Sequence, residues 1–282
     1  MPEGPECKIV ARELSLLRGL TLKSLKSSPS GRYRNGELEK MVVSGAINSV
    51  CDGKLLMVNE AVLGNNVEYV ACKGKLIYIK FSGGIYLLVT LGMTGTFSLV
   101  AGPHTSVIME FGNSRNENVE LFFNDQRHFG TISVGNESYF QHRMGQIGVD
   151  IFDNAFNTDY LKSMVEKSKP TTNICVFLMN QKNCAGLGNY IKSEALYLAE
   201  VHPMSTLGDI SVEQVANLVH YIKKIAKDSF ALGGMSMRDF VHLDGTPGEY
   251  LTYCNVYGKK VTKFGDAVKK IKTPDGRSTW YV

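Results

Sequence analysis

The stretch Asn183-Cys184-Ala185-Gly186-Leu187-Gly188-Asn189-Tyr190 decides the fold of the second half of this 282-residue chain. Apolar residues recur at helical spacing on both sides of it: Ile174, Phe177 and Leu178 before it, and Ile191, Ala195, Leu198 and Ala199 after it. Its glycines permit a tight double turn, and the next helix then opens with free backbone N–H groups that can hold a phosphate. The sequence therefore predicts two helices joined by a double turn with an anion-binding end.

Helical periodicity continues toward the C-terminus. A third apolar stripe follows a capping box at Ser211 and Gln214, and it consists of Val215, Leu218, Val219, Ile222 and Ile225. After Gly233-Gly234 the sequence predicts a Gly-rich loop and a β-hairpin that pairs Val256 to Val261 with Ser278 to Val282. We expect a helical domain over 151–250 and a finger over 251–282.

The sequence pattern of the first half of the chain predicts a β-rich domain. Short β-branched and aromatic runs fill 42–134, such as Lys75 to Phe81 and Ile85 to Leu91, which the turn Ser82-Gly83-Gly84 joins. Before them, the helical spacing of Cys7, Val10, Leu14 and Leu17 predicts one amphipathic helix. The predicted fold is α+β: an N-terminal helix on an antiparallel β-sandwich over 1–135, a linker over 136–150, and the helical domain and finger.

Composition sets the broad class. With 44% hydrophobic residues the chain can form two cores, and its net charge of +4 is mild. Basic residues nevertheless gather near the C-terminus, where they form either an electrostatic footprint for phosphates or a solvated face: Lys259, Lys260, Lys263, Lys269, Lys270, Lys272 and Arg277. No apolar stretch approaches the ~20 residues of a membrane span, and the N-terminus lacks a signal-peptide pattern. We expect a soluble intracellular protein.

The six cysteines are scattered without any C-x-x-C pair. This spacing argues against a metal knuckle and against a secreted disulfide framework, so we expect reduced thiols.

The N-terminal run Met1-Pro2-Glu3-Gly4-Pro5-Glu6 contains a candidate nucleophile and a candidate proton-transfer group. Once Met1 is removed, Pro2 becomes a free secondary amine, whose reference pKa of about 7.7–8.0 leaves a useful neutral fraction at physiological pH. Such an amine can attack the anomeric carbon of a deoxyribose and form an iminium adduct. Glu3 is one residue away, which suits proton transfer. The alternative interpretation is that a small second residue merely permits removal of methionine.

This start and six further blocks resemble the formamidopyrimidine-DNA glycosylase/endonuclease VIII family of bifunctional DNA-repair enzymes, whose members begin Met-Pro-Glu. The blocks follow the family order and span nearly the whole chain: Lys73-Gly74-Lys75, Leu91-Gly92-Met93-Thr94-Gly95, Asp125-Gln126-Arg127-His128-Phe129-Gly130, Gln181 to Pro203, Gly233 to Gly258, and Gly276-Arg277-Ser278-Thr279.

The resemblance implies catalytic roles for Pro2, Glu3, Lys75 and Arg277. Lys75 matches the family lysine that contacts phosphate beside the damaged nucleotide. Gly53-Lys54 is also a Gly-Lys pair. Only Lys75, however, is followed at the family distance by a strand, a turn, a strand and Leu91-Gly92-Met93. Arg277 matches the arginine at the tip of the family's finger, where its guanidinium grips the phosphates that flank the lesion.

The resemblance also implies DNA-binding residues. Met93, Arg127 and Phe129 match the trio that fills the space left by a flipped base, although core packing is the alternative for Met93 and Phe129. His128 stands where a second arginine is common, so the contacts of that arginine are in doubt. Three further residues are expected to contact DNA: Asn189 at the backbone, Glu6 near the lesion pocket, and Lys259 in the basic finger.

A typical member folds its finger around zinc with four cysteines, whereas this chain has only Cys254 in that region. One thiolate cannot build a tetrahedral zinc site, so we expect a zincless hairpin, no metal and no organic cofactor. The expected partner is damaged double-stranded DNA, with single-stranded DNA left open, and the expected state is a monomer.

The sequence has features of two substrate branches of the family. Gly4 and Leu187-Gly188-Asn189-Tyr190 look like the endonuclease VIII branch, which favours oxidised pyrimidines. Leu232 to Gly248, which includes Arg238-Asp239-Phe240, resembles the loop that covers an oxidised purine in the other branch. We expect oxidised pyrimidines and formamidopyrimidines, with 8-oxoguanine as the alternative. A non-catalytic damaged-DNA-binding protein is a further alternative, and intact Pro2 and Glu3 argue against it.

Overall fold

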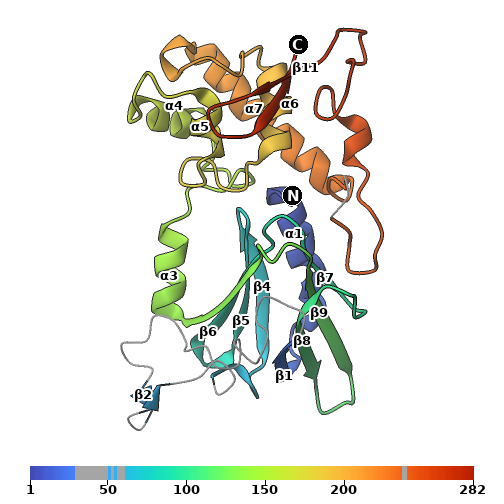
Figure 1. The fold of residues 1–282 in the computed structure, drawn as a ribbon. Helices are drawn as coiled ribbons and strands as arrows, with labels where there is room; N and C mark the ends of the chain where they lie inside the picture. The colour runs from blue at the N-terminus through green and yellow to red at the C-terminus, as the bar shows by residue number, and fades with distance from the viewer. Residues whose placement is uncertain (29–49, 52–53, 56–60, 237–239) are drawn as a thin grey trace. The chain divides into compact units, whose positions relative to one another are not determined.

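The structure is a computed structural model that describes residues 1–28, 50–51, 54–55, 61–236 and 240–282 (Figure 1). The chain divides into two compact units. Unit 1 contains Met1–Pro2, Glu6–Gly145 and Ser236–Gly248, and unit 2 contains Glu3–Pro5, Gln146–Met235 and Glu249–Val282. Two details differ from the expected boundaries. The expected linker over 136–150 contains the helix α3 (Glu137–Gly145), and Ser236–Gly248 groups with unit 1.

Unit 1 consists of two antiparallel sheets and the N-terminal helix. Helix α1 (Gly4–Glu13) continues into the 3-10 turn η1 (Leu14–Leu17). One sheet has the order β1-β8-β9-β7, with β1 (Thr21–Ser27), β7 (Gly95–Ser98), β8 (Thr105–Gly112) and β9 (Asn118–Asp125). The other has the order β10-β6-β5-β4, with β4 (Val67–Lys73), β5 (Leu76–Phe81), β6 (Ile85–Thr90) and β10 (Thr131–Asn136). Short strands β2 (Val50–Cys51) and β3 (Lys54–Leu55) pair with each other.

The core of unit 1 follows from the alternation of apolar residues along these strands. Large apolar side chains of α1, η1 and both sheets are buried, among them Ile9, Leu14, Leu22, Ile79 and Phe123. The turn η3 (Ser82–Gly84) joins β5 to β6 as expected. The predicted N-terminal helix and antiparallel sheets are therefore confirmed, except that the part of the expected β region within 42–49, 52–53 and 56–60 lies outside the described residues.

Unit 2 is mainly helical. It contains α4 (Thr158–Glu166), α5 (Ile174–Met179), α6 (Asn189–Leu198), the 3-10 turn η4 (Leu207–Asp209), α7 (Val212–Ala231) and the 3-10 turn η5 (Tyr250–Tyr253). The predicted capping box is present at the start of α7, because Ser211 accepts from Gln214 N and Gln214 accepts from Ser211 N. The predicted apolar stripes of α5, α6 and α7 meet in one core with Leu187 and Tyr190. The helix–two-turns–helix prediction is confirmed.

The finger is a hairpin, but its first strand was predicted wrongly. Strand β11 (Lys269–Lys272) pairs with β12 (Ser278–Tyr281), with Lys269 opposite Tyr281 and Lys272 opposite Ser278. The segment that we predicted as its partner, Val256 to Val261, makes other contacts. The Glu194 carboxylate accepts from the backbone N–H groups of Val256 and Tyr257 at 2.9 and 2.7 Å, and Val261 forms a β-bridge with Ala267. Among the described residues, no helix is both long and apolar enough to cross a membrane.

Candidate functional site

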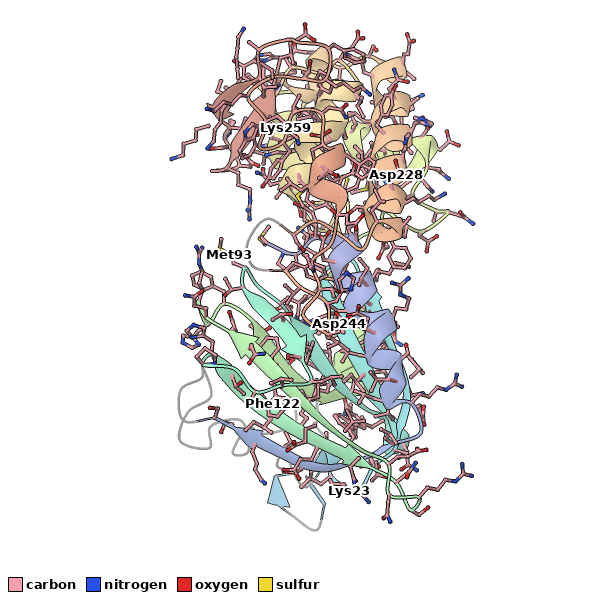
Figure 2. All side chains as sticks on the ribbon, turned by 90° about the vertical axis from the view of Figure 1, so that its right-hand side faces the viewer. Lys23, Met93, Phe122, Asp228, Asp244 and Lys259 are labelled. Carbon is pink, nitrogen blue, oxygen red and sulfur yellow. The ribbon has the colours of Figure 1, made fainter. Side chains whose placement is uncertain are left out.

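Strand register brings three loops to one end of unit 1. In the sheet β10-β6-β5-β4, Thr90 lies opposite both Leu76 and Thr131. The turn before Leu76, the loop after Thr90 and the loop before Thr131 therefore share one end of this sheet. In the other sheet, Gly95 pairs with Asp125. The loop after Thr90 and the loop before Thr131 therefore also connect to this sheet, at the end where Gly95 and Asp125 pair. These loops carry Lys75, Met93, Arg127 and Phe129, which are four of the predicted site residues. Figure 2 shows Met93 at one end of unit 1.

Asp125 is the buried residue that ties two of these loops together. Its Oδ1 accepts from Thr94 Oγ1 at 2.6 Å and its Oδ2 from Gly130 N at 2.6 Å. Thr94 Oγ1 in turn accepts from Arg127 N at 3.0 Å. The backbones also approach closely, because a Cβ on Gly92 would lie 2.6 Å from the Phe129 carbonyl carbon. Gly92 has φ +62°, which favours glycine. This network fixes how the two loops present their side chains.

Met93, Arg127 and Phe129, the predicted residues that fill the space left by a flipped base, lie on the loops that this network joins. Phe129 is 57% exposed, which is unusual for a large aromatic side chain and excludes core packing as its role. Arg127 is also exposed, and its Nη1 lies 3.7 Å from Met93 Sδ. His128, which replaces an arginine of the family pattern, is exposed and has φ 56°, so its backbone helps to form the turn between Arg127 and Phe129. The structure therefore brings Met93, Arg127 and Phe129 together.

The remaining candidates of unit 1 lie in different settings. Lys75 is half-buried in the turn between β4 and β5, next to Gly74 with φ 58°. Lys54, the rejected alternative, lies in β3. Glu6 is buried in the first turn of α1, and Pro2 is buried directly before Glu3.

Glu3 belongs to unit 2, where it caps helix α6. The side chain is 2% exposed, and its two carboxylate oxygens accept from Tyr190 N at 2.9 Å and Ile191 N at 3.4 Å. The N-terminus of a helix favours an anion there. Gly188 makes room, because a Cβ at that position would lie 2.1 Å from Glu3 Cδ. The double turn thus holds the carboxylate in one orientation, and the anion-binding end of α6 that we predicted for phosphate is occupied by Glu3.

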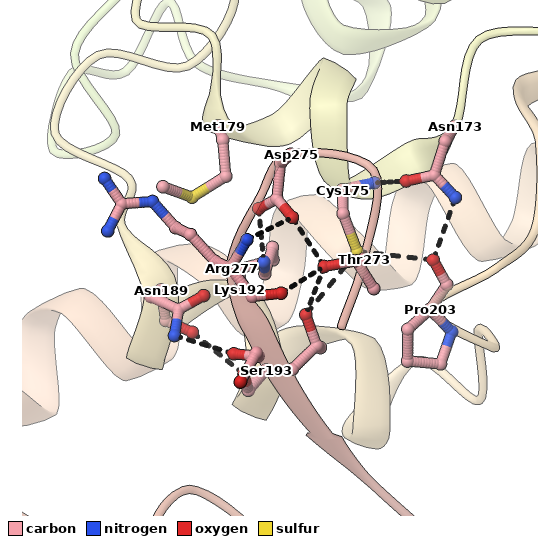
Figure 3. A network of polar contacts seen from close by, with 12 residues as sticks. Asn173, Cys175, Met179, Asn189, Lys192, Ser193, Pro203, Thr273, Asp275 and Arg277 are labelled. Atoms are coloured by element: carbon pink, nitrogen blue, oxygen red, sulfur yellow. Dashed lines mark hydrogen bonds and ion pairs between the residues drawn. The ribbon is translucent and has the colours of Figure 1, made fainter. Parts of the chain in front are cut away.

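Asn189 at the start of α6 lies near Arg277 of the finger. Asn189 Nδ2 donates to the carbonyl oxygen of Ser278 at 2.9 Å, so α6 and β12 are joined next to Arg277. Asn189 Oδ1 is buried and accepts no hydrogen bond from the described residues. Figure 3 shows the Arg277 guanidinium extending away from the buried contacts of the hairpin, on the side where Asn189 lies.

Tyr257 is a member of this group that sequence reasoning missed. Burial and the negative charge of Glu3 raise the pKa of its phenol, while Asn189 and the charge of Arg277 act in the opposite direction. Glu3, Asn189 and Arg277 therefore all act on the Tyr257 phenol. The signal for Tyr257 was its place in the block Gly233 to Gly258. Lys259, two residues further on, is half-buried.

Comparisons with known proteins identify the family of the chain. The N-terminal domain model of formamidopyrimidine-DNA glycosylases matches residues 1–132, and the helix–two-turns–helix domain model of the same enzymes matches 147–241. The formamidopyrimidine-DNA glycosylase of Legionella pneumophila (strain Lens) is 30% identical over 267 residues, which cover 92% of this chain and 88% of that protein. The chain belongs to the formamidopyrimidine-DNA glycosylase/endonuclease VIII family, a class of DNA glycosylases in base excision repair.

Solved structures share the fold. The Lactococcus lactis formamidopyrimidine-DNA glycosylase in complex with DNA containing N7-benzyl-Fapy-dG has a TM-score of 0.81 and 23% identity, over 100% of this chain and 98% of that chain. A second structure of that protein, in complex with DNA containing an oxidised pyrimidine, has a TM-score of 0.80 and 23% identity, over 99% of this chain and 97% of that chain.

The finger residues do not fit the zinc of a typical member. Cys254 is buried and its Sγ lies 3.9 Å from the Tyr250 carbonyl oxygen, and no cluster of three metal-ligating side chains occurs within the described ranges. Side chains hold the segment instead. Glu194 accepts backbone N–H groups of residues 255–257, and Thr262 Oγ1 donates to Asp266 Oδ2 at 3.1 Å across a turn.

We therefore expect a chelator to change neither the melting temperature nor the DNA-cleaving activity. One thiol cannot hold a zinc ion, and the hydrogen bonds that hold the segment do not depend on a metal that a chelator could remove. Thermal unfolding with and without the chelator, together with elemental analysis, checks this prediction. One zinc ion per chain, or a melting temperature that falls on chelation, contradicts it.

Proposed function

We propose that this chain is a bifunctional DNA glycosylase and AP lyase that removes oxidised bases with Pro2 as nucleophile. The proposal rests on one observation above all. Glu3, the residue bonded to Pro2, is buried and held by the first amides of α6. A carboxylate fixed next to a nucleophilic amine can move protons during the reaction.

The proposed reaction starts when the Pro2 nitrogen of the processed chain attacks C1′ of the damaged nucleotide. The bond between C1′ and the base breaks, the base leaves with a proton, and the sugar ring opens to an iminium linked to Pro2. Loss of a proton from C2′ then expels the 3′ phosphate by β-elimination, and a second elimination expels the 5′ phosphate. Glu3 exchanges protons with the sugar and the leaving base. No step requires a metal or an organic cofactor.

Phosphate contacts are proposed for both units. In unit 2, the Arg277 guanidinium offers a fork of donors, Asn189 and Tyr257 lie near it, and Lys259 follows Tyr257 by two residues. In unit 1, the Lys75 ammonium supplies a charge at the end of the sheet where Met93 and Arg127 lie. The proposed partner is damaged double-stranded DNA.

Met93, Arg127 and Phe129 are proposed to fill the space that a flipped base leaves. The thioether and the phenyl ring replace lost stacking, and the guanidinium can hydrogen-bond the orphaned base. The exposure of Phe129 supports this role, since the ring has apolar surface available to a partner.

We expect the double substitution of Met93→Ala and Phe129→Ala to slow base excision from duplex DNA by about tenfold or more, because unstacking a base costs a few kcal/mol that the wedge offsets. Cleavage of a preformed abasic site should change much less, since no base has to be flipped. Single-turnover rates on both substrates check this. Leu99→Ala, which removes another exposed apolar side chain of unit 1, is the matched control. Equal losses on both substrates argue against a wedge.

Oxidised pyrimidines and formamidopyrimidines are the proposed substrates, with 8-oxoguanine as the second candidate. The segment that resembles a purine-covering loop is held within unit 1: Glu13 contacts His242 Nδ1 and accepts from Leu243 N at 3.2 Å. Arg238 and Asp239 of that segment lie outside the described residues. A panel of duplexes with single defined lesions decides between the candidates. A rate on 8-oxoguanine that exceeds those on thymine glycol and formamidopyrimidines overturns the preferred assignment.

A further inference from the structure

A lysine of helix α6 and an aspartate of the finger form a buried ion pair. Lys192 lies on α6 and its side chain is 0% exposed, while Asp275 lies in the turn between β11 and β12 and its side chain is 4% exposed. Lys192 Nζ lies 2.6 Å from Asp275 Oδ2. Lysine is almost never buried completely unless it is paired, because its charge loses hydration. The pair therefore makes a specific link between helix α6 and the turn.

The second oxygen of Asp275 organises the turn itself. Asp275 Oδ1 accepts from Thr273 Oγ1 and from Arg277 N, the latter at 3.3 Å. The Arg277 carbonyl oxygen accepts from Thr273 N at 2.9 Å, and Thr273 Oγ1 lies 3.0 Å from it. The backbone of Arg277 is thus held through both its N–H and its carbonyl group. Figure 3 shows this network with Lys192 directly below Asp275.

Asp275 stays charged in this setting. Burial raises the pKa of its carboxyl group, but the hydrogen bonds from Lys192 and Thr273 and the lysine charge outweigh burial, so the pKa lies below its ordinary value. Buried ion pairs contribute little net stability compared with apolar side chains of similar size. Their better-attested effect is to specify one geometry.

Helix α6 carries a second link to the same hairpin. Asn189 is three residues before Lys192, so both side chains lie on neighbouring parts of one helix face. Asn189 bonds the Ser278 carbonyl oxygen, on the other side of Arg277 from Asp275. The helix therefore holds the chain on both sides of the arginine.

We propose that Lys192 and Asp275 are positioning residues that fix the Arg277 guanidinium relative to Asn189, and so act through Arg277 in binding DNA. This inference rests on the proposed role of Arg277 as a phosphate ligand. A purely structural ion pair would affect stability without affecting what Arg277 contributes.

A double-mutant cycle separates these two roles. Lys192→Met combined with Asp275→Asn removes both charges and leaves an amide oxygen that can accept from Thr273 and Arg277. Dissociation constants are measured on a duplex with a tetrahydrofuran abasic-site analogue, for wild type, Arg277→Ala, the neutral pair, and the neutral pair with Arg277→Ala. Melting temperatures report on folding. The control is Lys224→Met with Asp228→Asn, which makes the same change in an exposed ion pair on α7.

We expect Arg277→Ala to weaken binding tenfold to a hundredfold in wild type and in the control background, but no more than about threefold in the neutral-pair background. Equal factors in all backgrounds overturn the positioning role. If Arg277→Ala has no effect even in wild type, the proposed role of Arg277 fails, and the inference falls with it. If the neutral pair unfolds, Asp275→Glu keeps the charges and shifts the turn by one methylene. The factor by which Arg277→Ala raises the dissociation constant should then also be smaller than in wild type. An unchanged factor overturns the inference.

Discussion

Glu3→Gln should fold, bind damaged DNA with nearly unchanged affinity, and lose base excision by about 10²–10⁴-fold, the usual contribution of general acid–base catalysis. The amide has the shape of the carboxylate, and its oxygen can still accept from Tyr190 N. It cannot exchange a proton with the sugar or the leaving base. Because Glu3 is almost fully buried, loss of its charge at the helix N-terminus should cost up to about 2 kcal/mol of stability, which is less than the roughly 5–15 kcal/mol typical of a native protein.

Single-turnover excision and equilibrium binding measure the two halves of this prediction. Asp209→Asn is a matched control, because Asp209 also accepts a backbone N–H, from Thr206 N at 2.9 Å, beside a helical turn far along the chain from Glu3. Its excision rate should equal that of wild type. A Glu3→Gln enzyme that excises at nearly the wild-type rate shows that the general acid is another residue.

Retention of Met1 should abolish the covalent chemistry altogether. An acylated proline nitrogen has no lone pair to donate, so no iminium can form and borohydride should trap no adduct above background. Strand cleavage by elimination should be lost with it. Pro2→Gly should have the same direction of effect, because it replaces the secondary amine by a primary one with a more mobile backbone.

The retained and processed forms can be prepared from the same chain and separated by their mass. Affinity for the tetrahydrofuran duplex serves as the folding control, because that analogue cannot form an iminium. Equal trapping by the two forms means that an amine other than that of Pro2 is the nucleophile.

Local patterns predicted most of the fold. The capping box at Ser211 and Gln214, the glycine double turn before Asn189 and the turn at Ser82-Gly83-Gly84 all depend on neighbours in the sequence, and the structure has each of them. The exposed Phe129 could be predicted only through its block, because apolarity alone suggests a core position.

Three features that depend on partners distant in the sequence were not predicted. Strand β11 has the sequence Lys-Lys-Ile-Lys, which resembles a solvated charged run. Its strand structure depends on pairing with β12, in which the Trp280 ring centroid lies 4.9 Å from Lys270 Nζ of β11. Lys192 and Asp275 are 83 positions apart, so only the folded chain reveals their pairing. Tyr257 was missed for the same reason, since its neighbours Glu3 and Asn189 come from far upstream.

The central claim is that Pro2 is the nucleophile, and the most direct test is to locate the adduct. Processed enzyme is incubated with a duplex that contains an oxidised pyrimidine, treated with borohydride and digested, and the cross-linked peptide is sequenced by mass spectrometry. The account predicts a single adduct on the nitrogen of Pro2 in the N-terminal peptide. An adduct on Lys75 or on any other lysine, with an unmodified N-terminus, contradicts it.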